Sequence, residues 1–102
     1  MRTEPDHLAL HRHRVPGFGH YPFVCVLQTP ESGGRQRIVC PVSTTDEVGP
    51  TLPRLVIGAR EHVLILRLML AMPLAALGEA VGSAESIRPD IGRGIDRIFF
   101  GI

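Results

Sequence analysis

This chain of 102 residues lacks a clear excess of either positive or negative charge. Eleven basic and ten acidic side chains leave a formal net charge of +1 with the histidines neutral. The charges are also spread along the sequence, so electrostatics alone name neither nucleic acid nor a membrane as a partner. The length indicates a single domain over residues 1–102, small enough that a partner subunit would help to bury its core.

A long hydrophobic run is also missing. The apolar stretch over residues 68–77 is far shorter than the roughly 20 residues that a helix needs to cross a bilayer, and Pro73 interrupts it. The polar N-terminus, in which Glu4 and Asp6 interrupt any apolar run, does not resemble a secretory signal peptide. We therefore expect a cytoplasmic location and no membrane partner.

Patterns that carry catalysis or metal binding are scarce. His11 and His13 would lie on one side of an extended segment, but the third ligand that a zinc site normally adds is missing. Residues 17–19 lack the further glycine and the helix start of a phosphate-binding loop. No serine or cysteine lies in a recognisable nucleophile motif. The residues thus predict no catalytic residues, no metal and no cofactor.

The sequence has only two cysteines, Cys25 and Cys40, and each lies in a valine-rich run that suits a strand. The Gly33-Gly34 pair between them is a turn signal. A hairpin folded about this linker would bring Cys25 close to opposite Cys40. In the cytoplasm we favour two reduced thiols that behave as small apolar side chains over a disulfide.

Other apolar segments predict short strands over residues 8–13, 55–58 and 63–66, and a loop around Gly78. Leucine, methionine and alanine after residue 66 favour a helix instead, so the propensities conflict there. Isoleucines at helical spacing predict a terminal helix that begins near Arg88 or Pro89. Several strands and one helix indicate a small barrel or curled sheet.

The chain ends on an apolar tetrapeptide, Phe99-Phe100-Gly101-Ile102, where most chains become polar. Such an end must be buried in the core of the domain, in a dimer interface or in a binding partner. Large aromatic side chains are typical of interaction hot spots, because they bury much area at little entropic cost. The position of these residues at the end of the sequence does not distinguish among the core, a dimer interface and a binding partner.

Several short motifs follow one another between Tyr21 and the end of the chain. They are Tyr21-Pro22 with residues 23–26 and Gln28, residues 37–42, 57–58, 72–74 and 77–81, and then residues 90–91, 95–96 and 99–102. In the order of these motifs, and nearly in their spacing, the chain resembles the CcdB family of bacterial toxins. That resemblance implies a mainly β fold, an SH3-like β-barrel of the CcdB/MazF/Kid toxin type with a small additional sheet and a C-terminal α-helix.

The resemblance also implies a function. The chain would be the toxin of a type II toxin–antitoxin system, a homodimer that is not an enzyme and that binds the A subunit of DNA gyrase, trapping the cleaved-DNA complex. A CcdA-like antitoxin would neutralise it, and the two proteins together would bind operator DNA and repress their operon. A symmetric dimer suits this role, because it meets a twofold enzyme with the same patch used twice.

Carried over by position, the resemblance places the gyrase-binding residues at Asp96, Phe99, Phe100, Gly101 and Ile102. Phe100 stands where the family typically has tryptophan, and Asp96 stands where it has asparagine. A phenylalanine there keeps the ring that stacks on an arginine but loses the indole N–H.

Two alternatives share the expected fold. One is an endoribonuclease of the MazF and Kid type, with Arg35, Arg37 and His11 for phosphate binding and acid–base chemistry. The other is an inactive relative that still binds an antitoxin. The competing interpretation of the two arginines is that their charge at the edge of the hairpin prevents aggregation between sheets.

Overall fold

The computed structural model describes residues 6–17, 19–32 and 34–101, and their main feature is one antiparallel sheet of seven strands. The strand order is β4-β5-β3-β2-β1-β7, and β6 pairs with the first half of β3. The strands are β1 (Ala9–His13), β2 (Phe23–Val26), β3 (Gln36–Ser43), β4 (Arg54–Ile57), β5 (Arg60–Leu64), β6 (Leu70–Pro73) and β7 (Leu77–Ser83).

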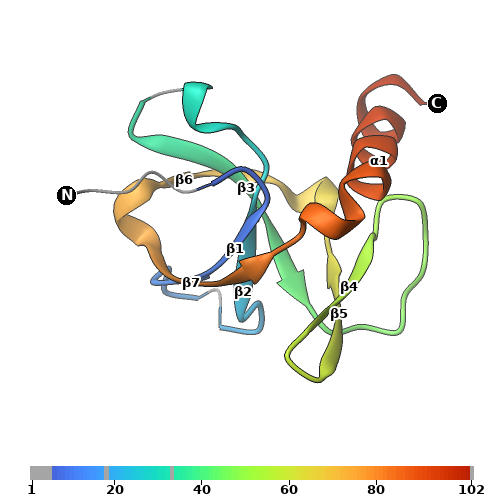
Figure 1. The fold of residues 1–102 in the computed structure, drawn as a ribbon, viewed down its shortest axis with the longest axis horizontal. Helices are drawn as coiled ribbons and strands as arrows, with labels where there is room; N and C mark the ends of the chain where they lie inside the picture. The colour runs from blue at the N-terminus through green and yellow to red at the C-terminus, as the bar shows by residue number, and fades with distance from the viewer. Residues whose placement is uncertain (1–5, 18, 33, 102) are drawn as a thin grey trace.

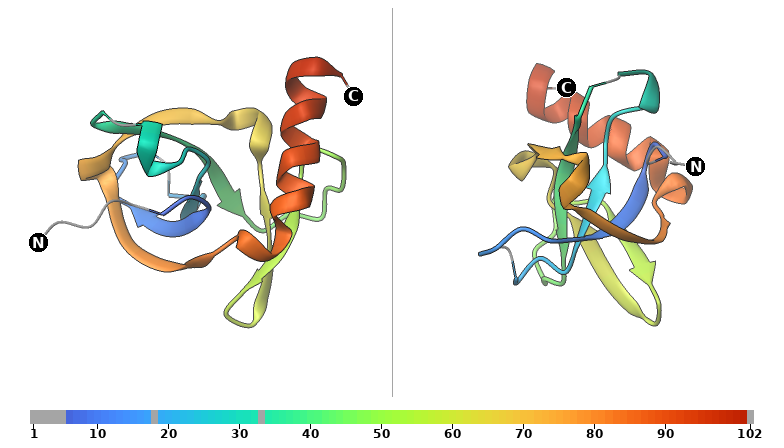
Figure 2. Two further views of the ribbon diagram at one scale, coloured as in Figure 1. Left: turned by 45° about the horizontal axis from the view of Figure 1, so that its top comes forward. Right: turned by 90° about the vertical axis from the view of Figure 1, so that its left-hand side faces the viewer.

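The sheet curls into a partly closed barrel, and the helix α1 (Arg88–Phe100) lies outside it (Figures 1 and 2). Single 3₁₀ turns lie between strands at η1 (Pro30–Ser32), η2 (Leu66–Leu68) and η3 (Leu74–Ala76), and η4 (Glu85–Ile87) connects β7 to α1. The predicted fold class is therefore confirmed. The hairpin of β4 and β5 extends away from the barrel as the expected smaller sheet, although its register joins it to β3.

The predicted hairpin is present with the predicted register. Strands β2 and β3 pair antiparallel, with Cys25 opposite Cys40 and Val26 opposite Val39. Both cysteines are fully buried free thiols, as expected.

Two of the three buried hydrophobic clusters among the described residues lie on opposite faces of the sheet, and the third is formed by Leu52, Val63 and Ile65. Because side chains alternate along a strand, β2 contributes Val24 and Val26 to the barrel interior, and Cys25 to the layer under α1. The interior cluster also includes Val39, Met72 and Leu77, whereas the layer under α1 includes Leu10, Cys40, Val42, Leu64, Leu66 and Ile91. The helix is thus anchored to one face of the sheet.

The loop expected around Gly78 is wrong, because Leu77–Ser83 forms β7 and pairs with β1. A Cβ atom on Gly78 would lie 3.2 Å from the carbonyl oxygen of Arg12, so this glycine permits a close backbone approach. Strand pairing also resolves the conflict between helix and strand propensities after residue 66. Strand β6 forms despite its leucine, alanine and methionine, because pairing with β3 outweighs intrinsic preference.

The terminal helix is confirmed, with Pro89 in its first turn. Ile91 and Gly94 face the core, and the helix ends at Gly101, whose left-handed φ of 71° lets its N–H reach the carbonyl of Arg97 at 3.1 Å. Over the described ranges, none of the helices has the length and apolarity to cross a membrane.

Candidate functional site

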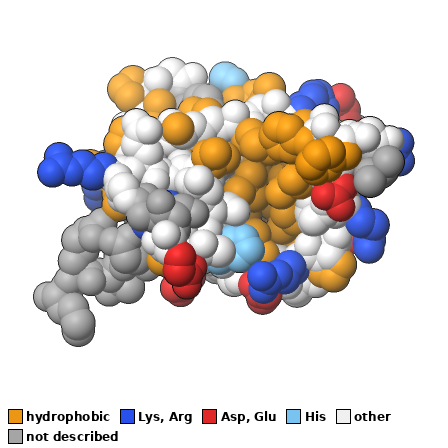
Figure 3. Space-filling view, turned by 90° about the horizontal axis from the view of Figure 1, so that it is seen from above, with side chains coloured by type: hydrophobic (Ala, Val, Ile, Leu, Met, Phe, Trp, Pro, Cys, Tyr) orange, Lys and Arg blue, Asp and Glu red, His pale blue; other side chains and the backbone are white. Residues whose placement is uncertain are grey.

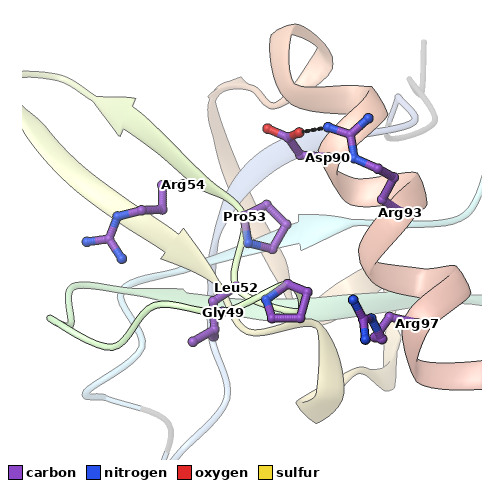
Figure 4. Close-up of a pocket in the computed structure, with 8 residues that line it drawn as sticks. Gly49, Leu52, Pro53, Arg54, Asp90, Arg93 and Arg97 are labelled. Carbon is purple, nitrogen blue, oxygen red and sulfur yellow. Dashed lines mark hydrogen bonds and ion pairs between the residues drawn. The ribbon is translucent and has the colours of Figure 1, made fainter. Parts of the chain in front are cut away.

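A cleft of about 680 Å³ lies between α1 and the segment that leads into β4 (Figure 4). One wall is the side of α1 that carries Asp90, Arg93 and Arg97. The opposite wall and floor are formed by Gly49, Pro50, Leu52, Pro53 and Arg54. Three guanidinium groups and one carboxylate therefore line a cleft with a partly apolar floor.

Arg54 is held firmly at the edge of this cleft. Its guanidinium donates to Oε1 of Glu61 at 2.9 and 3.1 Å, to the carbonyl of Glu47 at 2.7 Å and to that of Thr45 at 3.1 Å. A guanidinium that is fixed in this way loses little further entropy when it meets a ligand.

The two arginines on α1 differ in their partners. Arg93 forms an ion pair with Asp90, one turn earlier on the helix. The Arg97 guanidinium has no hydrogen bond or ion pair with any residue that the structure describes. It is the cation of the cleft that is most available to an incoming anion.

A second, shallower hollow of about 520 Å³ lies at the turn of the β2–β3 hairpin, lined by Gln28, Gly34, Arg35, Gln36, Arg37, Ile38 and Ala71. Arg35 is exposed there, whereas Arg37 is fully buried and donates to the carbonyls of Gly34 at 3.2 Å and Gln36 at 2.9 Å. Because Arg37 is buried and its guanidinium bonds to carbonyl groups of its own hairpin, it stabilises the turn.

The predicted set of His11, Arg35 and Arg37 does not form one exposed group, because His11 and Arg37 are buried. His11 lies on β1 opposite Val24, away from the hairpin turn, and is only 8% exposed. Its Nδ1 atom lies 3.0 Å from the carbonyl of Gly78, which fixes the ring between β1 and β7. The imidazole therefore belongs to the barrel and not to an arginine site.

The predicted contact residues at the chain end do lie together, at the last turn of α1. Phe99 is 61% and Phe100 72% exposed, and Asp96 and Gly101 are exposed as well. Ile102 lies outside the described residues. The aromatic end is thus not buried by its own domain, and hydrophobic side chains gather on the face from which Figure 3 views the molecule.

The histidines do not form a metal centre. Among the residues placed by the structure, no group of three potential metal ligands lies close enough to hold an ion. His13 bonds through Nε2 to the carbonyl of Tyr21 at 2.6 Å, and His62 packs against Phe23 with ring centroids 5.6 Å apart.

No motif in the sequence marks the arginines of the cleft as a site. The spacing of Arg93 and Arg97 by four residues is a signal that they share a helical face. Arg54 carries no comparable signal, because only the tertiary fold brings β4 beside α1.

Comparison with known proteins supports the fold. No protein-family model and no curated protein sequence matches this chain. A solved endoribonuclease in complex with its cognate antitoxin, from a mycobacterial species, is similar with a TM-score of 0.77 and 12% identity over 91% of this chain and 92% of that one. A structure of an Mtb toxin is similar with a TM-score of 0.73 and 17% identity over 88% and 99% of the two chains.

These similarities correct one prediction. The expectation that the chain is not an enzyme is contradicted, because an endoribonuclease has this fold over nine tenths of its length. The similarities agree with a toxin fold in general and do not single out the CcdB family.

Proposed function

We propose that this chain is the toxin of a toxin–antitoxin pair and that it cleaves RNA. The observation that carries the proposal is the fold shared with an endoribonuclease bound to its antitoxin, at a TM-score of 0.77 over 91% of this chain. An antitoxin is then its protein partner, and RNA is its substrate.

The cleft beside α1 is the site that suits this chemistry best. Cleavage of a phosphodiester needs cations where negative charge develops on the phosphate, and groups that move protons to and from the reacting oxygens. Arg54, Arg93 and Arg97 supply cations, and Asp90 supplies a carboxylate. The second hollow offers only Arg35 as an exposed cation.

The test is an RNA-cleavage assay with purified protein and three arginine variants. Arg97→Ala should lower the cleavage rate at least tenfold if the cleft is the site, because one cation at a reacting phosphate contributes about that much or more. Arg35→Ala tests the second hollow, and Arg60→Ala, at the exposed first position of β5, is the control. Absence of RNA cleavage by the intact protein would reject the proposal.

The exposed end of α1 favours a second candidate function, binding to the A subunit of DNA gyrase. Two adjacent aromatic side chains, 61% and 72% exposed, form an anchor of the kind that protein interfaces use. Gyrase-dependent DNA cleavage should then be lost in Phe100→Ala and after deletion of residues 100–102. Undiminished DNA cleavage in these variants would reject this candidate, and RNA cleavage that persists in them would favour the first.

The assembly is part of the proposal as well. A homodimer and the joint binding of operator DNA with the antitoxin stay predictions of the CcdB resemblance. Analytical ultracentrifugation of the purified chain tests the first, and a mobility-shift assay with and without the antitoxin tests the second.

A further inference from the structure

One exposed face of α1 combines cations with an aromatic ring. Arg93, Arg97 and Phe100 are separated by four and three residues, which places them on one side of a helix. Phe100 lies nine residues after the buried Ile91, or two and a half turns, so it points away from the core. Its exposure of 72% agrees with this placement.

This face borders the cleft described above. Arg93 and Arg97 form its helical wall, about one turn apart, and Arg54 lies across the cleft at the start of β4, with its guanidinium turned away from the helix (Figure 4). Pro50, Leu52 and Pro53 form an apolar floor between the two walls. A chain of linked anions could therefore run along Arg93 and Arg97, with Arg54 adding positive charge at the far edge, and continue toward the ring of Phe100.

We propose that this surface, made of Arg54, Arg93, Arg97 and Phe100, binds single-stranded RNA through its phosphates and one stacked base. The proposal rests on the proposed action on RNA and names the part of the surface that holds the substrate. Guanidinium groups match phosphate oxygens in a bidentate geometry, and a base stacks on an exposed aromatic ring. Cations that alternate with an aromatic side chain are typical of proteins that bind single strands.

The alternative occupant of such a cleft is an acidic peptide, and the aromatic ring argues against it. Carboxylates would satisfy the arginines equally well but leave the planar face of Phe100 without a stacking partner. No lining residue of the cleft presents a polar group that is placed to read a base edge, apart from the charged side chains. We therefore expect binding that depends little on base sequence.

Carboxylates on the same surface predict a gain as well as losses. Asp90 is engaged by Arg93, whereas Asp96 is exposed on the last two turns of α1. Its charge opposes an approaching phosphate, so Asp96→Asn should tighten RNA binding. A gain of affinity cannot result from misfolding.

The experiment measures fluorescence anisotropy of a labelled 2′-O-methyl oligoribonucleotide, which cannot be cleaved at its 2′ positions, over a range of salt concentrations. Arg97→Ala should weaken binding several-fold and lower the slope of log K against log salt by about 0.7. Phe100→Leu should weaken binding about tenfold with the slope unchanged, and Phe100→Tyr should restore it. Arg60→Ala and Val56→Ala, both at exposed positions on the β4–β5 hairpin, are the matched controls.

Three results would overturn the proposal. They are wild-type affinity in Arg97→Ala, wild-type affinity in Phe100→Leu, and displacement of the oligonucleotide by polyglutamate with no dependence on Phe100. RNA cleavage combined with any of them would reject this site and leave the proposed function standing. Binding with the expected pattern but without cleavage of RNA would reject the function and leave the site.

Discussion

Cys25 and Cys40 lie directly opposite each other on β2 and β3, and both thiols are fully buried. Burial raises the pKa of the Cys40 thiol well above its ordinary value, and the hydrogen bond with Cys25 acts in the same direction. The folded protein therefore keeps a proton on Cys40 at a pH at which an unfolded chain has released it.

This difference predicts a loss of stability in alkali. An unfolded cysteine has a pKa of about 8.5, so the contribution of Cys40 is complete below that pH and is lost as the pH rises toward the higher pKa of the folded state. The free energy of unfolding should fall with a slope that approaches about 1.4 kcal/mol per pH unit for this proton. Urea unfolding at pH 7 to 10.5 measures the slope, and Cys40→Ala should remove this part of it. An unchanged slope in the variant would contradict the assignment.

The same burial predicts that neither thiol is accessible in the folded protein. An aromatic disulfide reagent should react with native protein only as fast as the barrel opens, and two thiols per chain should react at once in denaturant without reductant. Zero reactive thiols in denaturant would instead show that the pair has been oxidised to a disulfide.

The hairpin and the terminal helix could be predicted from the sequence because local signals determine them. The two valine-rich runs and the Gly33-Gly34 pair specify pairing between neighbours in the chain, and the isoleucine spacing specifies the inward face of α1. Strand β7 could not be predicted in this way, because its partner β1 lies about 70 residues earlier in the chain.

Part of the candidate site could likewise be predicted from the sequence, and part of it could not. The grouping of Asp96, Phe99, Phe100 and Gly101 follows from their adjacency on one helix. The cleft requires the segment over residues 49–54 to lie beside α1, which depends on how the whole sheet curls. The set of His11, Arg35 and Arg37 does not form an accessible site, because the fold buries His11 and Arg37 and leaves only Arg35 exposed.

Two glycines of α1 predict opposite effects of the same substitution. A Cβ atom on Gly94 would lie 2.4 Å from Cδ1 of Leu66 and 3.0 Å from the carbonyl oxygen of Pro50, whereas one on Gly92 would meet nothing within 4 Å. Gly94→Ala should therefore lower the free energy of unfolding by about 1–3 kcal/mol through overpacking. Gly92→Ala should raise it by up to about 1 kcal/mol through helix propensity. Chemical denaturation of both variants measures the difference, and equal shifts would contradict the close contact between α1 and the segment at Pro50.

Arg54 ties the segment before β4 to the strand, and removing its guanidinium should loosen one wall of the cleft. The side chain holds the carbonyls of Thr45 and Glu47 as well as the carboxylate of Glu61, and it is about one third exposed. Arg54→Met keeps the aliphatic stem and removes every one of these bonds. Because the site is partly open to solvent, we expect a loss of only about 1–2 kcal/mol in stability.

The sharper measurement for Arg54→Met is local. Amide hydrogen exchange should become faster over residues 44–50 and stay unchanged in β2 and β3, because the core pairing does not involve this side chain. Arg60→Met, at the exposed end of the same hairpin, should change neither region. Equal acceleration in both variants would show that the guanidinium of Arg54 does not hold the segment. Acceleration in Arg54→Met alone would identify it as the residue that shapes the cleft.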